Sequence, residues 1–186
     1  MARGRKAETI KVITGRDNNL LKQLSKSGLC NSKQAKDHCG LSVDRIKKLE
    51  KSGYIKTSEH IVRGENNLII QLDKVGKEYC RQEFGTSSFG STQKNHLEHD
   101  IKLTEVYYRL EPEVQNTWVH ERDLIDRYYE LYPERQGELK TCIDATIEVN
   151  GEIIAIESLG DSYTKETIEF KQEISMSLGC SRMETF

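Results

Sequence analysis

The chain opens with a region in which apolar residues recur at helical spacing. Residues 18–55, NNLLKQLSKSGLCNSKQAKDHCGLSVDRIKKLEKSGYI, predict three short helices separated by glycine-containing breaks. The first is expected to end at Gly28, and the second is expected to begin with Ser32 as its N-cap. The residues expected to face inward are Leu20, Leu21, Leu24, Ala35, Cys39, Val43, Ile46 and Leu49.

The third of these helices has a basic outward face. Gly40 provides a tight turn before it, Ser42 is its expected N-cap, and Gly53 closes it. The outward face consists of Ser42, Asp44, Arg45, Lys47, Lys48 and Lys51. Two helices joined by a tight turn, the second of them polar and basic outside, predict a helix-turn-helix whose second helix lies in a major groove.

A hairpin and a further helix follow. YIKTSEHIVRGENNLIIQL, residues 54–72, predicts two strands around the polar turn 63–67, and a helix then begins at Asp73 with Val75 and Tyr79 inward. This order resembles the winged helix-turn-helix domains of bacterial regulators, most closely in LEKSGYIKTSE and IIQLDKVGKEYC. The resemblance covers roughly residues 14 to 84 and implies duplex DNA as a partner.

A change of composition marks the end of this region. FGTSSFGSTQ, residues 84–93, is rich in Gly and Ser and has no periodicity, so we expect a linker at 85–93 between domains at 1–84 and 94–186. The second domain begins with a helix capped near Asn95, has the strand-like WVHERDL, and then a polar stretch at 128–140. The apolar face of that first helix carries His99, Leu103, Val106 and Leu110, and Pro112 ends the helix.

The end of the chain predicts a small α/β unit. KTCIDATIEV and EIIAIES form a hairpin around Asn150-Gly151, which is a strong short-range turn signal. SYTKETIEFKQEISMSLG then predicts an amphipathic helix, and CSRMETF a last strand. The expected fold class is therefore α+β, a winged helix-turn-helix followed by a small α/β domain.

Charge divides the chain in the same place. Residues 1–90 carry 18 Lys+Arg against 10 Asp+Glu, a net of +8, and residues 91–186 carry 10 against 20, a net of −10. The basic half favours a polyanion as its partner. No apolar run approaches the ~20 residues that span a bilayer, and the start lacks the apolar segment of a secretion signal. We therefore expect a cytoplasmic protein without a membrane partner, whose five cysteines are reduced.

The second half also resembles a known family. NHLEHDIKLTEVYYRL, IDATIEV and AIESLGDSYTKETIEFK are similar to segments of the replication-relaxation family of plasmid and mobile-element proteins. That family couples a winged helix to a PD-(D/E)xK nuclease-like domain. The resemblance implies equivalent roles for the helix histidine His99, for Asp144 and Ala145 of the aspartate–alanine motif, for the strand glutamate Glu157 and for Lys171.

These residues raise the question of nuclease chemistry. Asp144 and Glu157, with Glu105 as a further acid, would be the ligands of Mg²⁺, and Lys171 would be the catalytic amine. The sequence departs from the nuclease pattern, because Leu159 stands where E-x-K expects lysine and Ile143 replaces the proline before Asp144. The alternative interpretation is a structural network in which the two acids pair with Lys171 or Arg122.

The sequence favours a DNA-binding protein over an enzyme, with no cofactor. It is expected to act as an auxiliary factor in replication, relaxation or transfer of a plasmid, phage or mobile element, or as a transcriptional regulator. Phosphate contacts are expected from Arg45, Lys47, Lys48 and Arg63, and base reading from Ser42, Asp44 and Arg45. A replication or relaxase protein and a second copy of the chain are the expected protein partners. The alternatives are a Mg²⁺-dependent DNA endonuclease and an acidic inhibitor that mimics DNA.

Overall fold

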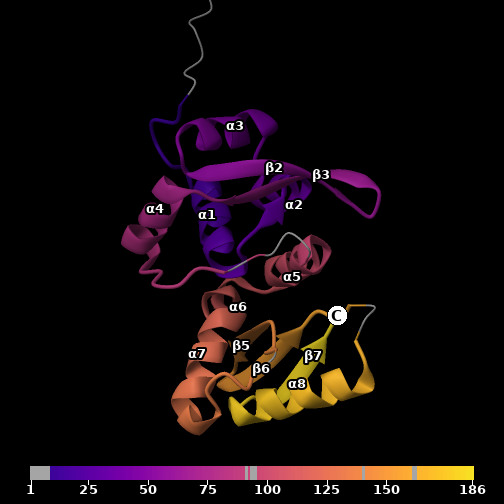
Figure 1. Cartoon of the computed structure of the whole chain (residues 1–186). Helices are drawn as coiled ribbons and strands as arrows, with labels where there is room; N and C mark the ends of the chain where they lie inside the picture. Colours follow the sequence, from indigo (N-terminus) through magenta and orange to yellow (C-terminus); the bar gives the residue numbers. More distant parts are fainter. Residues whose placement is uncertain (1–8, 91, 93–95, 140, 161–162) are drawn as a thin grey trace, which may run out of the picture. The chain divides into compact units, whose positions relative to one another are not determined.

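The computed structural model describes residues 9–90, 92, 96–139, 141–160 and 163–186. The chain divides into two compact units, unit 1 (Met1–Ser87) and unit 2 (Ser88–Phe186), both of which combine helices with a small sheet (Figure 1). The predicted α+β class is confirmed, and the division lies within the expected linker at 85–93. No helix in the described part of the chain is long and apolar enough to cross a membrane.

Helix α1 (Gly15–Ser27) begins with a reciprocal capping arrangement. The Thr14 hydroxyl accepts from the Asp17 amide, and the Asp17 carboxylate accepts from the Thr14 amide at 2.7 Å. This box satisfies two of the four amide groups that a helix start leaves without partners. As expected, Leu20, Leu21 and Leu24 are buried and Gly28, which has a positive φ of 85°, ends the helix.

Helices α2 (Ser32–Cys39) and α3 (Val43–Lys51) correct two expectations. The N-cap of α2 is Asn31, whose side chain accepts from the amide of residue 34, and Ser32 is the first helical residue. Val43 was expected to be buried but is 54% exposed, whereas Ile46 and Leu49 are buried. Residues three positions apart differ by about 60° around the axis of an α-helix. Val43 and Leu49 are six positions apart, so their side chains differ in direction by about 120°.

Three antiparallel strands complete the sheet of unit 1 in the order β1-β3-β2 (Cys30–Asn31, Glu65–Leu72 and Ile55–Val62). The hairpin turn is narrower than predicted, because only Arg63 and Gly64 lie between Val62 and its partner Glu65. Both turn residues have positive φ (51° and 79°), which matches the backbone twist that two-residue hairpin turns require. The sequence pattern does not predict β1, because a strand of two residues shows no periodicity.

Helix α4 (Lys74–Phe84) begins at the predicted N-cap Asp73, but its inward face differs from the prediction. Val75 is 45% exposed, and Gly76 is buried instead. A Cβ atom at Gly76 would lie 2.0 Å from the carbonyl oxygen of Tyr54. The backbone of α4 at Gly76 therefore lies close to the backbone of Tyr54, just before β2. The spacing of hydrophobic residues does not predict such a contact.

Unit 2 is built from more short helices than the sequence predicted. Its elements are α5 (Leu97–Arg109), α6 (Pro112–Asn116), β4 (Val119–His120), α7 (Glu121–Leu131), η2 (Pro133–Arg135), β5 (Ala145–Val149), β6 (Glu152–Glu157), α8 (Lys165–Ser177) and β7 (Arg182–Thr185). The expected cap Asn95 lies outside the described residues. WVHERDL is mostly not a strand, because only Val119 and His120 pair with β5 and Glu121 already begins α7.

The sheet of unit 2 has the order β4-β5-β6-β7. The first three strands are antiparallel, whereas β7 runs parallel to β6 after the crossover helix α8. The predicted Asn150-Gly151 turn joins β5 to β6 with positive φ at both residues (53° and 82°). This confirmed hairpin fixes the register of β5 and β6, and the register determines which side chains of the two strands share a face of the sheet.

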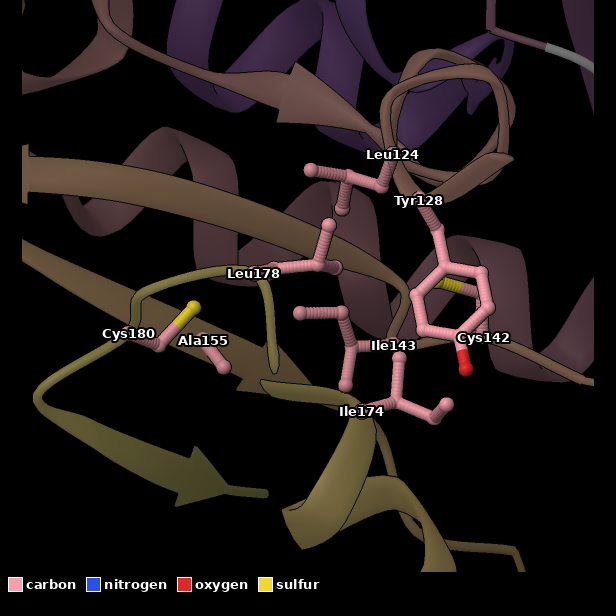
Figure 2. Close-up of a cluster of buried hydrophobic side chains, with 8 residues drawn as sticks. All are labelled: Leu124, Tyr128, Cys142, Ile143, Ala155, Ile174, Leu178 and Cys180. Carbon is pink, nitrogen blue, oxygen red and sulfur yellow. The ribbon is translucent and has the colours of Figure 1, made fainter. Parts of the chain in front are cut away.

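Two apolar clusters meet at this sheet, and β6 contributes Ala155 to one of them and the adjacent Ile154 and Ile156 to the other. One contains Ile143, Ala155 and residues of α7 and α8, and Figure 2 shows its members Leu124, Tyr128, Cys142, Ile143, Ala155, Ile174, Leu178 and Cys180. The other contains Ala145, Ile147, Ile154 and Ile156 together with Val106, Tyr107 and Trp118. The sheet thus has helix α5 on one side and helices α7 and α8 on the other.

All five cysteines are buried free thiols, as expected for a chain without disulfides. Cys30, Cys39 and Cys80 lie in unit 1, and Cys142 and Cys180 lie in unit 2. Burial raises the pKa of Cys80 and of Cys142 to about 12. These thiols are therefore unreactive apolar residues of the two cores in the folded chain.

Candidate functional site

The sheet register of unit 2 brings its two strand-end acids together. Ala145 pairs with Ile156, so Asp144 and Glu157 are cross-strand neighbours at one end of the hairpin. Lys171 reaches them from α8, and His99 reaches them from α5. Glu157 is 0% exposed, Lys171 3% and Asp144 7%. We call His99, Asp144, Glu157, Tyr163 and Lys171 the acid–base cluster.

Glu157 lies at the centre of the acid–base cluster. Its Oε1 accepts hydrogen bonds from Lys171 Nζ and, at 2.7 Å, from the Tyr163 hydroxyl. Its Oε2 accepts from the backbone amide of Asp144 at 3.2 Å. Lys171 Nζ also donates to the Tyr163 hydroxyl at 3.1 Å and lies 3.9 Å from Asp144 Oδ1. The ammonium therefore contacts both carboxylates.

His99 is held between two carboxylates. Its Nε2 lies 2.9 Å from Asp144 Oδ2, and its Nδ1 lies 3.2 Å from Asp100 Oδ1. The backbone amide of Ser158 also donates to Asp144 Oδ2, at 2.7 Å. Only a doubly protonated imidazole can donate at both ring nitrogens. These contacts therefore favour the imidazolium form of His99.

The titration of the acid–base cluster follows from this geometry. The hydrogen bonds to Asp100 and then Asp144 raise the pKa of His99 to about 10, against an opposing effect of burial. Burial, and then the charge of Asp144, raise the pKa of Glu157 to about 7, although Lys171 lowers it. Burial on its own lowers the pKa of Lys171, but the charges of Glu157 and Asp144 outweigh it and the net direction is upward. Both cations stay charged at neutral pH.

The structure brings Asp144, Glu157 and Lys171 together but leaves Glu105 out. Glu105 forms an ion pair with Arg109 at 3.5 Å along α5. It follows His99 by six residues, which is about 240° around the helix axis, so the two side chains leave on different sides. Of the two cations considered as partners for the acids, Lys171 forms the pair and Arg122 is exposed.

Tyr163 and Glu121 are members of this environment that the sequence did not identify. Burial, followed by the charge of Asp144, raises the pKa of Glu121, and Lys171 and His99 oppose this shift. Glu121 directly follows β4, so it is a third acid at a strand end. The expectation of a strand through residues 118–124 concealed that signal. For Tyr163 the sequence offered no signal beyond its position eight residues before Lys171.

The acid–base cluster also has the donors of a metal site. One ligand atom each of His99, Asp144 and Glu157 lies within 4.8 Å of the others. Among the described residues, Asp100 Oδ2 and Ser158 Oγ are buried without a hydrogen-bond partner. One imidazole and two carboxylates fit Mn²⁺ or Zn²⁺ better than Mg²⁺, which prefers oxygen ligands only. Such an ion would replace the His99 proton and compete with the Lys171 ammonium for the carboxylates.

The predicted basic surface of unit 1 is present on α3 and on the hairpin. Lys47 and Lys51 are exposed, Lys48 is half-buried, and Asp44 is exposed in the first turn. Ser42 is the N-cap, and its hydroxyl accepts from the Arg45 amide at 3.3 Å. Arg63 is exposed in the turn of the β2–β3 hairpin, which belongs to the same unit as α3. We call Lys47, Lys48 and Lys51 the α3 lysines.

Arg45 also has a structural role that the sequence did not predict. Its Nε donates to Asp17 Oδ1 and its Nη2 to Val12 O, both at 2.9 Å, and Nη2 also pairs with Asp17 Oδ2. Burial would raise the pKa of the fully buried Asp17, but the hydrogen bonds from Arg45 and Thr14 reverse this, so the pKa is lowered. Three of the five N–H groups of Arg45 are thus used inside unit 1. This guanidinium links α3 to Asp17 of α1 and to the chain before α1.

Comparison with known proteins assigns no family to this geometry, because no family model, no curated protein and no solved structure matches the chain.

Proposed function

We propose that this chain is a duplex-DNA-binding protein in which unit 1 is a winged helix-turn-helix. The element order supports this, since α2 and α3 are joined at the left-handed Gly40 and followed by the β2–β3 hairpin and α4. In this arrangement α3 is the helix that enters the major groove and the hairpin is the wing. The observation that carries the proposal is the set of α3 lysines on the outward side of that helix.

Charge favours DNA over a protein as the partner of this surface. Residues 1–90 have a net charge of +8, whereas residues 91–186 have −10. A polyanion gains affinity from such a surface through release of its counterions. The acidic unit 2 would repel DNA by itself, so unit 1 supplies the affinity and unit 2 offers a surface to a replication, relaxation or transfer protein or to a second copy of the chain.

The salt dependence of DNA binding tests this proposal. Binding of the full chain to a 30-base-pair duplex is followed by fluorescence anisotropy between 50 and 200 mM salt. Lys47→Ala is expected to reduce the slope of log affinity against log salt by about one, since one phosphate contact is lost. Lys77→Ala changes an exposed lysine of α4 and is the control, with no change expected. An equal effect of the two substitutions would contradict the assignment of α3.

A second candidate function is a metal-dependent DNA endonuclease with a PD-(D/E)xK-like unit 2. The convergence of Asp144, Glu157 and Lys171 favours it, as does the order of three antiparallel strands, crossover helix and parallel strand. Leu159 occupies the usual lysine position, but Lys171 reaches Glu157 from α8. His99, Asp144 and Glu157 would hold the ion, which would polarise a phosphate and activate a water molecule.

Nicking of supercoiled plasmid separates the two candidates. Wild type, Asp144→Asn and Glu105→Gln are incubated with Mg²⁺ or with Mn²⁺, and Glu105 serves as the matched acid outside the acid–base cluster. Nicking that is lost only in Asp144→Asn would establish the endonuclease. Intact plasmid whose mobility is shifted equally by all three proteins would leave a DNA-binding protein. Fluorescence of Trp118, which is buried in unit 2, checks that each variant is folded.

A further inference from the structure

A hollow of about 600 Å³ opens beside the first turn of α3 in unit 1. The side chains that line it include Thr14, Arg16, Ser42 and Arg45, and Gly40 contributes backbone. It therefore has two guanidinium groups and no carboxylate in its lining. Two acids adjoin lining residues in the sequence. Asp17 is fully buried and faces Arg45, and Asp44 is exposed in the first turn of α3 but is not among the lining residues. A hollow with this charge is suited to an anion.

Arg45 is held so that one end of its guanidinium remains available. Nε and Nη2 are bonded to Asp17 and to Val12 O. Nη1 has no hydrogen-bond partner among the described residues, so two N–H donors remain on a group whose orientation is already fixed. Preorganised donors lose little conformational entropy when they bind a phosphate. Asp17 is thus a positioning residue for Arg45.

Arg16 supplies the second cation. It is exposed, and its Nη1 lies 3.4 Å from the carbonyl oxygen of Gly40. Its Nε, Cζ and Cδ atoms lie 3.5–3.7 Å from the point where a Cβ on Gly40 would stand. The guanidinium therefore extends across the α2–α3 turn at the edge of the hollow. The Ser42 hydroxyl accepts from the Arg45 amide, and its hydrogen is free to donate.

We propose that this hollow binds one backbone phosphate of duplex DNA, with Arg16, Arg45 Nη1 and the Ser42 hydroxyl as its donors. The inference rests on the proposed DNA-binding function and extends it to a residue outside α3. Phosphate contacts fix the position of a protein on the duplex, and this one is next to the amino end of α3. The bound phosphate would set how far the first turn of α3 enters the groove.

The salt dependence of duplex binding by the full chain tests the role of Arg16. Each phosphate contact contributes a slope of about 0.9, so between 50 and 200 mM salt the wild type is expected to lose about 3- to 4-fold more affinity than Arg16→Ala. Arg16→Lys is expected to keep most of the wild-type slope, because the charge remains. Arg81→Ala is the control, since Arg81 is an exposed arginine of α4 that pairs with Glu78.

Two further measurements make the outcomes distinguishable. If Lys47→Ala lowers the slope and Arg16→Ala does not, the hollow is not a DNA contact, although the proposed function stands. If wild type does not bind the duplex at all, the proposed function fails together with the inference. Titration with inorganic phosphate, followed by NMR shifts of the Arg16 and Ser42 amides, provides the last test. Binding of inorganic phosphate at the hollow without any effect of Arg16→Ala on duplex binding would identify a free-anion site and overturn the proposal.

Discussion

Replacement of Lys171 by methionine tests the balance of charges in the acid–base cluster. Methionine has a similar length and no charge, so the change removes the cation beside Glu157 and leaves the side-chain volume nearly unchanged. The Lys171 and Glu157 side chains are 3% and 0% exposed, which means that solvent cannot replace the lost ammonium. We expect Glu157 to remain protonated in the variant at pH values where it is ionised in the wild type.

The size of the effect follows from the pKa of Glu157, which is about 7 in the folded wild type. Above that pH the folded variant holds one proton more than the wild type, so its stability relative to the wild type falls by about 1.4 kcal/mol per pH unit. The expected cost is therefore small at pH 6 and about 2 kcal/mol at pH 8.5. Loss of one partner of a buried pair costs about 3–5 kcal/mol, which sets the upper bound.

Urea unfolding followed by tryptophan fluorescence measures this cost in unit 2 alone. Trp118 is the only tryptophan of the chain and is 1% exposed in the core of unit 2. With a slope of about 2 kcal/mol per M, the urea midpoint at pH 8.5 is expected to fall by about 1 M. Lys165→Met is the control, because Lys165 lies on the same helix but is 89% exposed.

A cost of the same size at pH 6 and pH 8.5 would refute this account of the charge balance. The double variant Lys171→Met, Glu157→Gln provides the second check. With no ionisable group left at position 157, its stability relative to the wild type should no longer fall by the additional amount above pH 7. A double variant with the same pH dependence as Lys171→Met would show that another group takes up the proton.

Three further predictions concern the remainder of the fold. The pKa of His99 is about 10 in the folded chain and 6.5 in the unfolded chain, so its stabilising contribution is complete below pH 6.5 and is lost as the pH rises to 10. In urea unfolding, the free energy of unfolding should therefore decline over this pH range, and His99→Gln should reduce the decline. The same decline in His99→Gln as in the wild type would contradict this prediction. Gly76→Ala should destabilise unit 1 by about 1–3 kcal/mol in thermal melts despite the higher helix propensity of alanine, because the added Cβ meets a carbonyl oxygen, whereas Gly15→Ala, with open space around it, should not destabilise it. Ile46→Ala should cost about 2–5 kcal/mol and Val43→Ala at most about 0.5, and equal melting temperatures would contradict the reported orientation of α3.

The elements of unit 1 were largely predictable, because each carries its own local signal. Helical spacing and capping residues fix where α1, α3 and α4 begin, and a glycine with positive φ lies at or directly after the C-cap of each helix. The direction of a side chain near a helix end is a different matter. Val43 and Val75 are apolar but exposed, because they lie at a different angle around their helices from the buried residues Leu49 and Cys80. The spacing of apolar residues does not determine which of them the core covers at a helix end.

The candidate site of unit 2 was predicted in part. The pattern of two strands and a helix pointed to Asp144, Glu157 and Lys171, and the resemblance added His99. The strand register brings the two acids together. Glu105 was proposed as a metal ligand only because it is acidic. Its position around α5 directs its side chain away from the acid–base cluster and toward Arg109. The contacts of Tyr163 with Glu157 and Lys171 depend on the path of the chain between β6 and α8. Sequence spacing does not determine that path.

The burial of all five cysteines allows the opening of each core to be measured from the rate at which the thiols react. A thiol-reactive reagent can modify these residues only when the surrounding core opens, so the labelling rate of each thiol reports the opening free energy of its own neighbourhood. Cys80 lies in unit 1 and Cys142 in unit 2, which allows mass spectrometry to time the two units separately in one sample. Added duplex DNA should slow labelling in whichever unit it binds, and this readout requires neither a mutation nor a fluorescent probe.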